Sequence, residues 1–316
     1  MDNSTDFLLT NSTHAIRPPF VRDEKFILPP PVAEHGFSAL ISTPKYEQST
    51  DSSFLFDTGV SENGVIHNAD IFGVDFSNID GIILSHGHFD HFAGLVNIVK
   101  RISSSPRRTS NHSVNIFTHP DAFLRRWAIF PDGTRAKSPV LDEHRLQKIG
   151  AKIHKNTGVN YLPNKESPLL VITGEIPRET SFEKGFPYQY IEDSSNEKSL
   201  IPDPLIKDDQ ALVVNILRKG LVILTGCGHA GIINTINYAK KITGIDRIHA
   251  ILGGFHLPAD DGIYEAAIEP TLKEFQKAQP DYLIPCHCTG WKAANRIIEI
   301  MPEKFIQSSI GTTFQF

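Results

Sequence analysis

The hydrophobic pattern of the chain consists of short apolar runs, several of which are followed by apolar residues at helical spacing. The run Ile82–Leu84 is followed by four such residues, Leu95, Ile98, Val99 and Ile102. A short apolar run is typical of a buried strand, and this spacing is typical of one face of a helix. Apolar runs return at 220–225, 248–252 and 282–284, and helical patterns follow at 232–239 and 291–300. The pattern therefore predicts an α/β protein.

Further apolar runs predict additional strands. Residues 36–42 and 53–57 are expected to form an antiparallel pair, joined by a polar loop at 45–52. Single strands are expected at 114–118, 169–173, 211–217 and 311–316.

Two stretches lack these patterns. Residues 1–19 are polar and end in Pro18–Pro19, so they are expected to form a tail or strap without a fold of its own. Residues 20–316 are expected to form a single domain. Within it, residues 130–210 are irregular and rich in Pro, Ser and charged residues, and such segments are usually functional or mobile. We interpret part of this insert as a substrate lid, with a solvated surface excursion as the alternative.

Composition and charge narrow the class of protein. The chain has 316 residues, 40% of them hydrophobic, and a net charge of -5, which is enough chain for a full core. The mild acidity argues against nucleic-acid binding, which normally requires a basic patch, and no apolar run is long enough to span a membrane. Three cysteines do not form a disulfide framework, and the N-terminus does not resemble a signal peptide. We therefore expect a cytoplasmic protein with a small-molecule partner; the sequence leaves its oligomeric state open.

Potential metal ligands directly follow the apolar run Ile82–Leu84. His86, His88, Asp90 and His91 fall within six positions, where a strand stops and a helix starts. His86 and His88 point the same way in extended backbone, so they can bind one ion. Asp90 and His91 lie in the turn and the first helical residues, so they can serve a second ion. Imidazole and carboxylate ligands suit zinc, iron and manganese.

Other strand ends also present a polar side chain. His229, His256 and His287 each follow one of the later apolar runs, and four such turns along one sheet edge are hard to explain by packing. Asp57 ends the run at 53–57 and is interpreted either as a hydrogen-bond partner of a metal-bound histidine or as an Asx turn. His119 follows the run at 114–118, where a structural role is the simpler interpretation.

These motifs carry a resemblance to a known family. His-Gly-His-Phe-Asp-His at 86–91 resembles the HxHxDH signature of the metallo-β-lactamase superfamily, and Phe56–Gly59 is similar to its first motif. More narrowly, residues 173–178, 224–229, 253–256 and 285–290 resemble a subgroup similar to dihydropterin and dihydropteroate synthase-type enzymes. The resemblance covers about residues 35–316. It implies an αββα sandwich, with two mixed sheets face to face, helices outside and a two-metal site along one sheet edge.

The resemblance also implies ligand roles. It assigns His86 and His88 to the first metal, Asp90 and His91 to the second, and His287 to the second as well. The chain departs from the usual pattern at Cys227, which stands where relatives have an Asp that bridges the metals. Either His229 takes over this role, which we favour, or Cys227 joins as a thiolate. Cys286 and Cys288 flank His287 and are expected to point away from it and to pack.

The implied activity is that of a metal-dependent hydrolase. A metal-bound hydroxide would open an acyl bond, such as a lactam, ester or carbamate, in a small molecule. One or two zinc ions are expected, with iron or manganese as alternatives. Asp90 and His256 are the expected catalytic residues, and Glu175 and Arg178 are candidates for binding substrate. The alternatives are a phosphoesterase and a pterin-directed transferase; the substrate and the metal count stay open.

Overall fold

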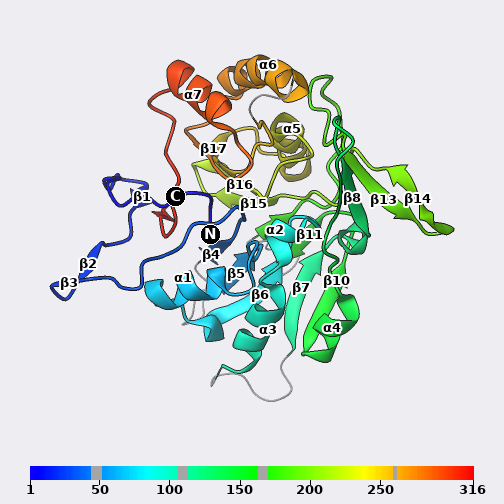
Figure 1. The fold of residues 1–316 in the computed structure, drawn as a ribbon. Coiled ribbons are helices and arrows are strands. Elements are labelled where there is room, and N and C mark those ends of the chain that lie inside the picture. Colours follow the sequence, from blue (N-terminus) through cyan, green and yellow to red (C-terminus); the bar gives the residue numbers. More distant parts are fainter. Residues whose placement is uncertain (44–51, 106–112, 163–169, 259–261) are drawn as a thin grey trace.

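The computed structural model describes residues 1–43, 52–105, 113–162, 170–258 and 262–316 (Figure 1). Most of the expected loop at 45–52 lies outside the described residues, as does the first residue of the expected strand at 169–173.

Five strands form the first of two large sheets. They are β4 (Ala39–Thr43), β5 (Ser52–Phe56), β6 (Ile79–Ile83), β7 (Val114–Thr118) and β10 (Ala151–Lys155). Their spatial order is β10-β7-β6-β5-β4. β4 and β5 pair antiparallel, as their apolar runs predict, and the other neighbours are parallel.

Six strands form the second large sheet. They are β11 (Asn160–Leu162), β12 (Leu170–Ile172), β15 (Leu212–Ile216), β16 (Gly220–Thr225), β17 (Ile248–Gly253) and β18 (Tyr282–Pro285). They follow this order across the sheet. Pairing is antiparallel from β11 to β16 and parallel from β16 to β18, so both large sheets are mixed.

Strand alternation builds a core between the two sheets. Phe54 and Phe56 of β5 point toward the second sheet and pack in one cluster with Leu212 and Leu224, whereas Leu55 belongs to the cluster on the opposite face. Successive side chains of a strand point to opposite faces, so one apolar strand contributes to two cores. This explains why β5 reads as a continuous apolar run rather than as an alternating one.

Helices cover the outer faces of both sheets (Figure 1). α1 (Gly64–Phe72) and α3 (Leu95–Ser103) cover the first sheet, and α5 (Ile232–Thr243), α6 (Gly262–Ala278) and α7 (Trp291–Ile300) cover the second. The four apolar residues that predicted α3 are all fully buried. Short helical segments complete the set: α2 (Phe89–Phe92), α4 (Glu143–Lys148), η1 (Phe76–Asn78) and η2 (Pro120–Phe123). The predicted αββα sandwich is confirmed.

The segment 130–210 is more regular than expected. It contributes α4, β10, β11 and β12 to the main body. It also supplies three strands of a small antiparallel sheet that lies at the right of Figure 1. This sheet has the order β14-β13-β8-β9 and consists of β8 (Arg126–Ile129), β9 (Arg135–Lys137), β13 (Gln189–Asp193) and β14 (Asn196–Pro202). Its described residues are largely half-exposed or exposed, so apolar alternation does not mark these strands in the sequence.

The N-terminal residues are more closely tied to the body than a tail would be. β1 (Ala15–Ile16) pairs with β19 (Thr313–Phe314), within the expected last strand, and β2 (Val21–Arg22) forms a hairpin with β3 (Lys25–Phe26). No helix among the described residues is both long and apolar enough to cross a membrane.

Candidate metal centre

Loops from both sheets meet at the carboxyl ends of their strands. The loop after β6 carries His86 and His88 and leads into α2, which carries Asp90 and His91. The loops after β16 and β18 carry Cys227 and His287. Gly226 lets the two sheets approach here, because a Cβ at this position would lie 2.2 Å from the Ser85 hydroxyl oxygen and 2.8 Å from an Asp57 carboxylate oxygen. A glycine at position 226 is therefore needed to bring these loops together.

Three histidine rings form the first group of donor atoms. His88 Nδ1 lies 3.0 Å from His86 Nε2 and 3.0 Å from His229 Nε2. The outer nitrogens have partners elsewhere: His86 Nδ1 lies 2.9 Å from the Ser85 hydroxyl, and His88 Nε2 lies 3.0 Å from Gln189 Oε1. The amide oxygen of Gln189 can only accept, so His88 carries its proton on Nε2 and directs the lone pair of Nδ1 into the group.

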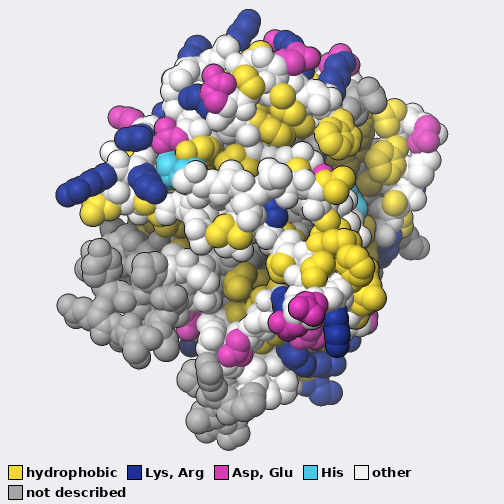
Figure 2. Space-filling model, turned by 90° about the vertical axis from the view of Figure 1, so that its left-hand side faces the viewer, with side chains coloured by type: hydrophobic (Ala, Val, Ile, Leu, Met, Phe, Trp, Pro, Cys, Tyr) yellow, Lys and Arg dark blue, Asp and Glu magenta, His cyan; other side chains and the backbone are white. Residues whose placement is uncertain are grey.

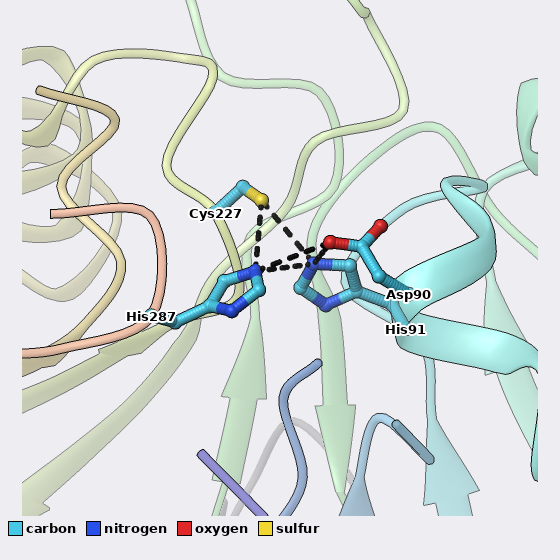
Figure 3. A group of neighbouring side chains, drawn as sticks. All are labelled: Asp90, His91, Cys227 and His287. Carbon is cyan, nitrogen blue, oxygen red and sulfur yellow. Dashed lines mark hydrogen bonds and ion pairs between the residues drawn. The ribbon is translucent and has the colours of Figure 1, made fainter. Parts of the chain in front are cut away.

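Asp90, His91, Cys227 and His287 form the second group, and their side chains point toward one another (Figure 3). His91 Nε2 lies 3.1 Å from His287 Nε2, and Cys227 Sγ lies 3.2 Å from the first nitrogen and 3.3 Å from the second. Asp90 Oδ2 lies 3.4 Å from His287 Nε2. All four residues are buried.

Asp57 orients His91 from the side opposite the group. Its carboxylate accepts hydrogen bonds from His91 Nδ1 at 2.7 Å and from the Ser85 amide and hydroxyl, each at 2.7 Å. His91 therefore carries a proton on Nδ1, and its Nε2 is the ring nitrogen that faces the second group. Of the two interpretations of Asp57, the structure matches the hydrogen bond to a candidate ligand.

Burial and charge act differently on the two groups. Burial lowers the pKa of His86 and His229 well below the usual value and that of His88 to about 4, so these rings are neutral donors. Burial alone would raise the pKa of Asp90, but the neighbouring His91 and His287 lower it below its usual range. Asp90 is therefore ionised.

The donor set fits divalent metal ions. Two imidazole nitrogens that face each other with free lone pairs at about 3 Å repel one another unless a proton or a cation lies between them. A set of buried imidazole, carboxylate and thiol donors is the set that binds zinc and other first-row transition metals. We therefore treat both groups as candidate metal sites.

Cys227 lies where the two groups meet. Its sulfur is grouped with Asp90, His91 and His287 on one side and with His86 and His229 on the other. Of the two candidates for the position of the usual bridging Asp, the geometry favours Cys227 rather than the preferred His229. His229 instead joins the first group. The preference for His229 assumed that Cys227 and His229 are joined by extended backbone, as in His86-x-His88. Gly228 between them has a left-handed φ of 75°, so the backbone turns there instead.

Cys288 does not point away from the site as expected. Its sulfur lies 2.9 Å from Cys227 Sγ, whereas Cys286 packs against the cluster between the sheets, as predicted. The expectation assumed extended backbone around His287, but His287 has a left-handed φ of 46°, which breaks the alternation of side-chain directions.

Substitutions can test this assignment of donors. We expect His229→Ala to lose one of two bound ions, because only the first group contains His229. Cys227→Ser should weaken the binding of both ions at least about tenfold, because changes to residues that only contact a ligand already weaken metal binding 10–100-fold. Metal content after equilibration with a weak chelator measures both effects. Cys286→Ser is the matched control and should bind metal like the wild type; a normal metal content in Cys227→Ser would contradict the shared position.

His256 lies beside the first group. Its Nε2 is 3.3 Å from His229 Nδ1 and 3.2 Å from the Tyr264 hydroxyl. Its expected catalytic role stays a prediction.

His119 has a structural contact, because its Nδ1 accepts from the Asp121 amide and caps η2.

The sequence did not reveal the residues that hold the His86–His88 turn through hydrogen bonds to the Gly87 backbone. Asp208 accepts from the Gly87 amide at 2.7 Å and from Arg126 at 2.6 Å, and Arg126 donates to the Gly87 carbonyl at 3.2 Å. Arg126 and Asp208 are almost completely buried. The position of Asp208 just before the apolar run at 211–217 was the available signal, but a surface turn has the same pattern.

Glu175 and Arg178 make contacts away from both donor groups. The Glu175 carboxylate is 4.0 Å from the Lys207 ammonium, and the Arg178 guanidinium donates to the carbonyls of Leu205 and Ile206. Burial lowers the pKa of Arg178. These contacts connect residues 175–178 to the loop before β15; a role in binding substrate stays a prediction.

The fold and the site define a class of protein. An αββα sandwich with an HxHxDH turn and further donors at the ends of neighbouring strands is the architecture implied by the resemblance to metallo-β-lactamases. The family model described as "Metallo-beta-lactamase superfamily" matches residues 46–156.

Individual relatives support this class over most of the chain. The chain is 31% identical over 290 residues to a 7,8-dihydropterin-6-methyl-4-(beta-D-ribofuranosyl)-aminobenzene-5'-phosphate synthase of Methanocaldococcus jannaschii, covering 90% of each chain. An uncharacterized protein of the same organism is 30% identical over 283 residues, with 88% of this chain and 92% of the relative covered. The chain belongs to the metallo-β-lactamase superfamily, and its resemblance to the dihydropterin synthase-like subgroup is confirmed.

A solved structure supports the same fold. A metal-dependent hydrolase of the β-lactamase superfamily superposes with a TM-score of 0.69 at 21% identity, covering 99% of this chain and 96% of the other.

Proposed function

We propose that the protein is a metal-dependent hydrolase that opens an acyl bond in a small molecule. The observation that carries this proposal is the pair of donor groups that share the Cys227 sulfur. His86, His88 and His229 would hold one ion, and Asp90, His91 and His287 the other, with Cys227 between them. Zinc suits this mixture of nitrogen, oxygen and sulfur donors, with iron or manganese as alternatives.

In the proposed reaction, two side chains near the metal ions handle the water and the protons. Divalent ions held here would supply a nucleophile from water near neutral pH and would polarise the carbonyl oxygen of the substrate. Asp90 stays ionised, so its carboxylate can accept a hydrogen bond from the attacking water and orient it. We also assign to Asp90 the transfer of that water's proton. His256 lies beyond His229 and would hold a proton for the leaving group on one of its ring nitrogens.

The surface supports a small-molecule substrate. On the face shown in Figure 2, Lys and Arg side chains are interspersed with Asp and Glu, and the described residues form no extended basic area there. Together with the net charge of -5, this argues against a nucleic acid as substrate.

A pterin-directed reaction is the second candidate function, and a row of aromatic rings favours it. Phe186 has its ring centroid 6.3 Å from that of His88 and 6.1 Å from that of His256. Tyr188 follows at 5.7 Å from Phe186, and Phe130 at 6.0 Å from Tyr188. Such a row suits a flat ring system, since aromatic pairs stabilise one another beyond their buried area. The named relative is a synthase of a dihydropterin compound.

A substrate panel distinguishes these functions. Lactams, esters, carbamates and phosphodiesters would be incubated with the purified, metal-loaded protein, alongside a reduced pterin that carries a phosphate. We expect hydrolysis of one of the acyl classes, loss of at least 99% of this activity after chelation, and recovery on addition of zinc, iron or manganese. Full activity in metal-free protein would contradict the proposal. Conversion of the pterin alone would support the second candidate.

A further inference from the structure

The N-terminal segment reaches the candidate metal centre at His287. The side-chain Nδ2 of Asn3 donates to the His287 carbonyl at 2.9 Å, and Asn3 Oδ1 lies 3.3 Å from His287 Nδ1. An Asp2 carboxylate oxygen accepts from the backbone amide of His287 at 3.1 Å and from the backbone amide of Asn3 at 2.7 Å. Two consecutive residues therefore contact the backbone and the ring of a candidate ligand that lies 284 positions away from Asn3.

The hydrogen bonds of Asn3 determine which nitrogen of His287 carries a proton. The His287 carbonyl can only accept, so the NH₂ group of Asn3 must face it. The oxygen of the same amide then faces His287 Nδ1, which has to donate. The other ring nitrogen, Nε2, then faces His91, Cys227 and Asp90, and its lone pair can bind an ion there once a bound metal has displaced any proton on it.

The contacts of Asp2 hold the unusual backbone of His287. This residue has a φ of 46°, in the left-handed region that residues other than glycine rarely adopt. Such a conformation persists only when its surroundings hold it. Asp2 is 5% exposed, and its own backbone carbonyl accepts from the Glu34 amide, so the side chain is held against the turn that contains His287.

We propose that Asp2 and Asn3 are positioning residues for His287, and that they set the affinity of the second metal site. This inference rests on the proposed function, because it requires that His287 binds a metal ion. Neither side chain touches the reacting atoms; both act through His287. Partners of this kind typically change metal affinity 10–100-fold when they are removed.

Asn3→Ala is the test variant, because Asn3 is exposed and its loss should leave the fold intact. Arg17→Ala is the matched control: Arg17 donates to the Gln307 carbonyl and the Thr312 hydroxyl, so its loss loosens the same segment without touching His287. His287→Ala identifies which site depends on His287. Each metal-free protein would be titrated with zinc against a chromophoric chelator, and the cobalt spectrum would be recorded for the loaded forms.

We expect Asn3→Ala to weaken the site that His287→Ala removes by at least tenfold and to change the cobalt spectrum of that site only. Arg17→Ala should match the wild type in both measurements. Equal metal affinities in Asn3→Ala and wild type, or equal losses of affinity in Asn3→Ala and Arg17→Ala, would overturn this inference and leave the proposed function intact. A wild-type protein that takes up no metal would overturn the proposed function, and the inference with it.

Discussion

Replacement of Asp90 by asparagine is expected to lower turnover about a thousandfold while the fold is retained, in line with the 10²–10⁴-fold contribution of general acid–base groups. Asparagine has nearly the same shape and keeps one oxygen. It lacks the negative charge that orients water and accepts a proton. The measurement is kcat on the substrate that the panel identifies, with metal content determined on the same sample.

Asp70→Asn is the matched control for this change. Asp70 pairs with Arg101 on the surface, with half of each side chain exposed, and lies outside both donor groups. Its substitution should leave kcat unchanged. If Asp90→Asn retained metal and turned over at a rate within threefold of the wild type, Asp90 would have no part in the reaction.

The second large effect is expected on stability, from Asp208→Ala. This change leaves the Arg126 guanidinium buried without its charge partner and leaves the Gly87 amide without its acceptor. Breaking a buried ion pair from one side typically costs about 3–5 kcal/mol. We expect a loss of this size in the free energy of unfolding, measured by urea denaturation of the metal-free protein.

Two further variants separate the charge effect from the lost packing. Asp70→Ala breaks the exposed pair with Arg101 and should cost at most about 1 kcal/mol. The double variant Arg126→Met/Asp208→Leu removes both buried charges and should recover much of the loss, because a buried pair replaced by apolar residues is often neutral. A double variant as unstable as Asp208→Ala would show that the hydrogen bonds to Gly87, rather than the unpaired charge, dominate.

Local pattern predicted the elements that build the sandwich. β16 and α7 have the bounds that their apolar runs and helical spacing predict, and β7 matches its predicted range. β16 is buried at every position, whereas β7 and α7 are buried at a regular period, and in both cases neighbouring residues are enough to reveal the element. The small sheet of β8, β9, β13 and β14 was not predicted, because its strands carry few buried positions.

The sequence by itself determined the fold class, the superfamily and the identity of most candidate ligands, because the HxHxDH turn and the later strand ends are local patterns. The tertiary structure decided how these donors are grouped. It placed Cys227 between the two groups and turned Cys288 toward it, through left-handed backbone at Gly228 and His287 that side-chain spacing does not reveal.

Only the tertiary structure also revealed the residues that hold the candidate ligands in place. Asp208 reaches Gly87 across 121 positions of sequence, and Asn3 reaches His287 across 284. Hydrogen bonds over such separations depend on how the two sheets close on each other. No periodicity or motif in the sequence reports that closure, and for this reason the donor atoms were predictable and their supports were not.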